Sequence, residues 1–336
     1  MMSQLLADGE ITPGIASEEY ISRRKRLLEV LPEKSLAIIA SADQQMMTDV
    51  VPYPFRQSGD YLYITGCTQP GGVAVLSEES GLCMFMPDTN KEDIVWQGQT
   101  AGVEAAMDFF KADKAFPLSQ LQKILPEMIE RSKMVYHNVK TSSSYKNLDA
   151  FRRASLNKKV KDLAYYTDEL RWVKSKSEVK LMRESASIVS QFSCSLFILH
   201  CPNEMFLPPG WFCDSALCAS FHPVVGGGAN GSVIHYSRND NKIKTGDLLL
   251  MDVGCHNDRA GIYIPPVPIL KENAPERYRG IGIRIEDEVL VTETGHEVLT
   301  ASVPKEIPHL TTLMSMGDRS AAMDAHELQQ QRAACS

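Results

Sequence analysis

The chain has 336 residues, of which 43% are hydrophobic and 23% are charged, and its formal net charge is −7. These values are those of a globular protein with room for two domains, and a net negative charge without a sustained basic stripe excludes nucleic acid as the main partner. No apolar run is long enough to cross a bilayer, so we expect no membrane partner.

The first 140 residues alternate between strand and helix patterns. Ser17, followed by Glu18 and Glu19, predicts the start of a helix that ends at Pro32. Apolar runs predict strands at residues 36–40, 73–76 and 82–86. The second half of residues 55–66 alternates between apolar and polar residues with period 2. Helices are predicted at residues 102–110 and 118–132. This alternation predicts an α/β domain.

A cluster of basic residues lies inside the first predicted helix, at residues 23–26. Glu18, Glu19 and Glu29 flank it. We interpret this mixed-charge stretch as a solvent-exposed helix face.

A polar stretch at residues 140–146 predicts a loop near a domain boundary. Ser175 and Glu178 then form the pattern of a capping box at the start of a long helix. From residue 191 to residue 220 the amphipathic period is lost, and four of the eight cysteines fall there. We interpret this segment as foreign to the surrounding domain, and the cysteine spacing disfavours a zinc site.

Residues 224–236 are rich in glycine. A phosphate-binding loop would need a helix after the glycines, whereas residues 232–236 have a strand pattern. We therefore expect these glycines to allow a close approach of backbone to a site.

Two predicted strands each deliver a carboxylate. Asp252 follows the apolar run 248–251, and in residues 281–286 isoleucines alternate with polar residues, which places Arg284 and Glu286 on one face. Paired carboxylates on rigid strands bind hard divalent cations. The alternatives are a turn-capping role for Asp252 and a surface ion pair between Arg284 and Glu286.

Four segments resemble the aminopeptidase P (Xaa-Pro aminopeptidase) family: residues 55–66, 230–240, 246–255 and 275–295. The chain most resembles the plant mitochondrial intermediate-cleaving branch, which is similar to the Xaa-Pro aminopeptidase 3 type. The resemblance implies an α/β creatinase-like N-terminal domain at residues 13–160 and an incomplete α+β pita-bread catalytic domain at 161–310. The polar, Ala/Gln/Met-rich end of the chain predicts a disordered tail at 311–336.

The same resemblance implies roles for individual residues. Asp252 matches the first Asp ligand of a pair of Mn²⁺-class ions, and Glu286 matches the final, bridging Glu. Arg284 matches the arginine beside that Glu, and His235 matches a catalytic histidine on the substrate side. Trp96 resembles an N-domain tryptophan that approaches a neighbouring subunit's site. In the family, a hydroxide that bridges the two ions attacks the peptide carbonyl.

Several ligands of the family have no match in this chain. The bridging Asp of a Gly-Tyr-x-Ser-Asp-x-Thr-Arg-Thr motif and the His of a Gly-His-x-x-Gly motif are missing, and Arg259 stands where the family's Glu-Pro-Gly-Ile-Tyr-Ile-Pro has its glutamate. His256 and Asp258 are poor substitutes, because Arg259 repels a cation. We therefore expect one weak Mn²⁺ ion or none, and an impaired enzyme.

Two functional classes remain open. The first is a metal-dependent aminopeptidase that acts on peptide or protein N-termini, either Xaa-Pro or intermediate-cleaving. The second is a non-catalytic module that binds or forms homo-oligomers through its N-terminal domain. The resemblance implies a mitochondrial location, and the absence of a visible presequence makes the cytosol the alternative.

Overall fold

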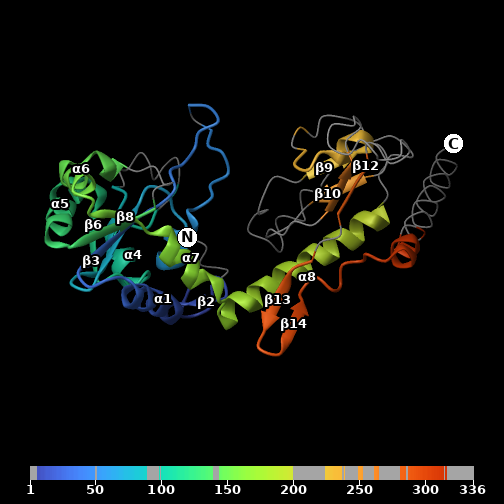
Figure 1. Cartoon of the computed structure of the whole chain (residues 1–336), viewed down its shortest axis with the longest axis horizontal. Helices are drawn as coiled ribbons and strands as arrows, with labels where there is room; N and C mark the ends of the chain where they lie inside the picture. Colours follow the sequence, from blue (N-terminus) through green and yellow to red (C-terminus); the bar gives the residue numbers. More distant parts are fainter. Residues whose placement is uncertain are drawn as a thin grey trace, which may run out of the picture. The chain divides into compact units, whose positions relative to one another are not determined.

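The computed structural model describes residues 6–49, 51–88, 98, 100–138, 144–199, 224–236, 238, 249–252, 261–264, 281–284, 287–313 and 315. The chain forms two compact units, Met1–Glu178 and Val179–Ser336, called here the first unit and the second unit (Figure 1). No helix in the described part of the chain is long and apolar enough to cross a membrane.

The first unit is built on a six-stranded mixed sheet in the order β6-β5-β4-β3-β7-β8. β3 runs antiparallel to β4 and parallel to β7, β4 runs antiparallel to β5, and the two outer strands are parallel to their neighbours. The strands are β3 (Ser35–Ala40), β4 (Val73–Ser77), β5 (Gly81–Met86), β6 (Lys114–Pro117), β7 (Met134–His137) and β8 (Val160–Asp162), and a small β1–β2 pair (Glu10–Thr12, Ile15–Ala16) precedes them. The strands predicted at residues 36–40, 73–76 and 82–86 are confirmed.

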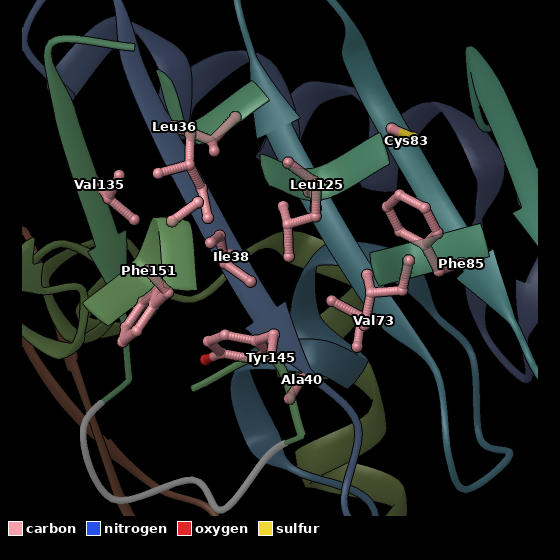
Figure 2. Packing of buried hydrophobic residues seen from close by; sticks show 14 of the residues in the cluster. Leu36, Ile38, Ala40, Val73, Cys83, Phe85, Leu125, Val135, Tyr145 and Phe151 are labelled. Atoms are coloured by element: carbon pink, nitrogen blue, oxygen red, sulfur yellow. The ribbon is translucent and has the colours of Figure 1, made fainter. Parts of the chain in front are cut away.

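Helices cover both faces of this sheet, which is why all six residues of β3 are buried. The helices are α1 (Ser17–Val30), α2 (Gly59–Thr65), α4 (Val103–Asp108), α5 (Leu121–Arg131), α6 (Asp149–Leu156) and α7 (Ala164–Trp172), with short turns η2 (Leu118–Gln120) and η3 (Ser144–Asn147). Figure 2 shows one face, where Leu36 and Ile38 of β3 pack with Leu125 of α5 and Phe151 of α6. The predicted α/β architecture and its helices at 17–32, 102–110 and 118–132 are confirmed.

The alternating stretch within residues 55–66 is a helix, α2, although alternation of this kind is typical of a strand. Asp60, Tyr61, Tyr63, Ile64 and Thr65 are all buried, so the helix has no polar face that could reveal its period. The helix ends at Gly66 with φ 73°, where an added Cβ would collide with Ile11 Cγ2. Only glycine fits this left-handed position without strain.

The interpretation of residues 23–26 as a solvent-exposed helix face is wrong for Arg23 and Arg24, whereas Lys25 is exposed. Arg23 and Arg24 are only 2% and 6% exposed. The Arg24 guanidinium donates to three backbone carbonyls, those of Ile64 (2.9 Å), Phe110 (2.8 Å) and Lys111 (2.8 Å). Burial lowers the pKa of Arg24 to about 10, still far above neutral pH, so the side chain stays charged. It joins α1 to the ends of α2 and α4.

The long helix α8 (Lys176–Leu199) begins with the predicted capping box. The Ser175 N–H donates to Glu178 Oε2 at 2.7 Å, and the Glu178 N–H donates to Ser175 Oγ at 3.0 Å, so both predicted bonds are confirmed. The helix continues through residue 199, and residues 200–223 lie outside the described part.

Within the second unit, the hairpin of β13 (Val289–Thr292) and β14 (Gly295–Val298) is tied to α8 by an ion pair. Arg183 Nε donates to Glu297 Oε1 at 2.9 Å and Arg183 Nη2 donates to Glu297 Oε2 at 2.6 Å. A helical turn at residues 307–313 reaches into the predicted tail, and residues 316–336 lie outside the described part.

Replacing Arg24 with methionine tests the buried role of the basic cluster. Arg24→Met leaves three carbonyls without a donor, so we expect the free energy of unfolding to fall by about 3 kcal/mol. Lys25→Met, on the same helix but exposed, should change it by less than about 0.5 kcal/mol. The measurement is hydrogen exchange of the β3 and β4 amides in the full chain. Equal effects of the two substitutions would contradict the assignment.

Candidate metal centre

The strand that carries Asp252 lies beside the glycine-rich segment. β9 (Val224–Gly227) pairs antiparallel with β10 (Leu249–Asp252), and Asp252 lies opposite Val224. The turn η4 (Gly228–Ser232) follows β9 directly. Val224, Tyr236 and Leu250 form a small buried cluster. This cluster fixes β9, β10 and the chain after η4 to one another.

Gly226 makes the tight junction between β9 and η4 possible. An added Cβ at Gly226 would lie 2.8 Å from the Asn230 carbonyl oxygen and 2.9 Å from the Gly231 nitrogen. Both atoms are backbone and cannot rotate away. The expected close approach of backbone is therefore present at Gly226.

The strand predicted at residues 232–236 is wrong. Residues 228–232 form the 3-10 turn η4, and His235 lies in an exposed turn just after it. Ser232 Oγ donates to the Ala229 carbonyl at 2.7 Å, and the Val233 N–H donates to the Asn230 carbonyl at 3.1 Å. These local bonds satisfy the polar groups that a strand would offer to a neighbour.

The strand that carries Arg284 comes to the same region. β11 (Gly261–Ile264) pairs antiparallel with β12 (Ile281–Arg284), and Arg284 lies opposite Gly261. β12 lies against η4 and near β10, and Figure 1 shows β9, β10 and β12 gathered together. The backbone thus brings Asp252, Arg284 and the turn of His235 into one neighbourhood.

The side chains that would decide the site lie outside the described residues. This holds for the side chains of Asp252 and Arg284, and for all of Glu286 and Trp96. It also holds for His256, Asp258 and Arg259. The roles given to Asp252, Glu286, Arg284 and His235 therefore stay predictions.

The carboxylate that follows Glu286 is already engaged elsewhere. Asp287 Oδ1 accepts from Thr300 Oγ1 at 2.6 Å and forms an ion pair with Lys305 Nζ at 2.7 Å. Burial raises its pKa, but the bonds from Lys305 and Thr300 outweigh burial and hold the pKa of Asp287 below its usual value. With a lysine on this oxygen, Asp287 is a poor substitute for a missing metal ligand.

The described strands and turn of this region supply few ligands for a divalent ion. β9, η4, β10, β11 and β12 together contain one carboxylate residue, Asp252, and one cation, Arg284. Among the described residues no three His, Cys, Asp or Glu side chains cluster. Two divalent ions would need further anionic ligands, from outside these elements, to offset the free energy of losing their bound water.

Comparisons with known proteins follow the two units. Residues 20–136 match the aminopeptidase P N-terminal domain, and residues 203–264 match metallopeptidase family M24. The mitochondrial intermediate cleaving peptidase 55 of Arabidopsis thaliana is 43% identical over 93% of this chain and 85% of its own length. The chain belongs to the aminopeptidase P family of metallopeptidases. It therefore has the family's α/β creatinase-like domain and an incomplete pita-bread catalytic domain.

Two further relatives show how much of the family's length this chain spans. Intermediate cleaving peptidase 55 of Saccharomyces cerevisiae is 30% identical over 74% of this chain, but over only 53% of its own length. The solved aminopeptidase PepP of Pseudomonas aeruginosa has the same fold, with a TM-score of 0.79 at 23% identity, over 91% of this chain and 99% of PepP. The alignment with the Arabidopsis protein runs over 425 positions, so at least 89 of them have no residue in a chain of 336.

The family match also corrects one expectation. Residues 191–220 were expected to be foreign to the surrounding domain. The match to family M24 begins at residue 203, and α8 continues to Leu199. The segment from residue 203 onward is therefore family sequence, and its loss of amphipathic period does not mark an insertion.

Gly226→Ala tests the geometry of the β9–η4 junction. The added Cβ meets only backbone, so the junction must shift, and we expect the β9 and β10 amides to exchange hydrogen about tenfold faster, which is about 1.4 kcal/mol. Gly295→Ala is the matched control in the same unit, because no atom lies within 4 Å of its added Cβ. Unchanged exchange in Gly226→Ala would refute the close approach.

Proposed function

We propose that this chain is an aminopeptidase P-type metalloaminopeptidase whose catalysis is impaired. The observation that supports it is the single carboxylate on the strands around η4, together with the positions missing from the alignment. Two-metal hydrolysis needs both ions about 3.5–4 Å apart to form the attacking hydroxide. A chain with too few ligands keeps the family's framework and loses most of its turnover.

The proposed metal is Mn²⁺, held as one weak ion or not at all. Asp252 and Glu286 are the proposed ligands. Arg284 beside Glu286 and His235 on the turn after η4 are the proposed substrate-side groups. The proposed substrates are the N-termini of peptides or processed proteins, because the relatives are named as intermediate cleaving peptidases and Xaa-Pro aminopeptidases. The proposed location is the mitochondrion, after the Arabidopsis relative, with the cytosol as the alternative.

Turnover of an Xaa-Pro peptide tests this proposal. The rate at which the N-terminal residue is released is measured with and without added Mn²⁺, for this chain and for the Arabidopsis relative. We expect the rate of this chain to be at least about 100-fold lower in both conditions, because ligands of the ions are lost. Glu286→Ala and the control Glu288→Ala should then both leave the residual rate unchanged. A rate that rises with Mn²⁺ and is abolished by Glu286→Ala alone would show an active enzyme.

The second candidate function is a non-catalytic module that assembles with further copies of this chain. A loop of the first unit supports it, because Met46, Met47, Val51 and Tyr53 are each about half exposed there. The loop is held in one shape by the Met47 N–H bond to the Val51 carbonyl (2.7 Å) and the Tyr53 N–H bond to the Gln45 carbonyl (2.9 Å). A fixed loop with clustered apolar side chains is typical of a protein interface.

Light scattering after size exclusion tests the assembly. We expect the full chain to elute as a dimer or larger species, and Met47→Asp with Tyr53→Asp to convert it to a monomer, because charge on both residues opposes burial. Leu156→Asp, at an 83% exposed position of the same unit, is the matched control and should not change the mass. A monomeric wild-type chain would exclude this function.

A further inference from the structure

Two helix N-termini meet within the first unit. Glu19 lies in the first turn of α1, and the capping box of Ser175 and Glu178 starts α8. The two ends are joined directly, because Ser175 Oγ donates to Glu19 Oε1 at 2.7 Å. Each carboxylate lies where its own helix dipole favours negative charge.

Arg23 connects the two carboxylates. Its Nη2 lies 2.5 Å from Glu19 Oε1 and 3.0 Å from Glu178 Oε1. Its Nη1 donates to the Tyr63 carbonyl at 3.3 Å, and its guanidinium lies over the rings of Tyr20 and Tyr63, 4.8 and 4.4 Å from their centroids. The Arg23 side chain is 3% exposed, so water screens these contacts little.

Arg23 supplies the one positive charge that separates the two carboxylates of this network. Without it, Glu19 and Glu178 would face each other in a poorly hydrated place, and like charges there repel strongly. Burial raises the pKa of Glu19, but hydrogen bonds from Ser175 and Ser177 and the charge of Arg23 outweigh it and hold that pKa below its usual value. The guanidinium cannot follow a moving partner, because the two rings and the Tyr63 carbonyl fix its plane.

We propose that Arg23 is a conformational latch that holds the first turn of α8 against α1 and so keeps the start of α8 docked on the first unit. α8 is the helix in which the chain passes from the first unit to the second, since the boundary falls after Glu178. The latch joins residues 155 positions apart. Its role does not rest on catalysis, so an inactive chain would keep it.

Hydrogen exchange of the full chain tests the latch. In Arg23→Met, which keeps a long apolar side chain between the two rings, we expect the amides of residues 180–187 to exchange about tenfold faster or more, while the amides of β3, β4 and β5 keep their rates. Lys25→Met is the matched control, because Lys25 is exposed on the same helix and its distance to Glu29 is 3.9 Å. It should leave both sets of amides unchanged.

Glu178→Gln separates the latch from the capping box. Glutamine still accepts the bond from the Ser175 N–H, but it loses its charge attraction to Arg23. We expect faster exchange at residues 180–187 in this variant too. The latch is overturned if Glu178→Gln behaves as the wild type, or if Arg23→Met speeds exchange in β3, β4 and β5 as much as in α8.

Discussion

Negative charge around the bound ions is the constraint on which the proposed chemistry of this chain depends. A divalent ion binds to a protein only when its ligands offset the free energy of losing its hydration water. Two ions close together also repel each other, so they need several carboxylates. The strands around η4 offer Asp252, and the neighbouring strand ends in Arg284. Asp287, which follows the proposed ligand Glu286, is already bound to Lys305. The family framework is present, and our proposal is that these strands supply too little negative charge for two ions.

The first unit is not subject to that constraint. Helices cover both faces of its sheet, and residues of α5 and α6 pack on the sheet to form the core cluster (Figure 2). Two buried arginines complete it: Arg24 satisfies backbone carbonyls at the ends of α2 and α4, and Arg23 binds the start of α8. The core of the first unit therefore does not depend on the proposed metal ligands, which lie in the second unit.

Local patterns in the sequence were sufficient where the structure is decided locally. The strand at residues 36–40 is an apolar run because both of its faces are covered, and the capping box of Ser175 depends on a partner three residues away. The failures are of two kinds. α2 and the turn of His235 imitate strands, because α2 is buried all round and Val233 and Ile234 are β-branched. Arg23 and Arg24 were placed in solvent because all their hydrogen-bond partners except Glu19 lie 40 to 155 residues away in sequence, and only the fold brings them together.

Native mass spectrometry of the intact chain, purified in the presence of excess Mn²⁺, measures the charge deficit most directly. The account predicts that a chain carries at most one bound ion, and that Asp252→Ala removes it. Two ions bound to nearly every chain would contradict the account, because they would require anionic ligands beyond those the strands around η4 supply.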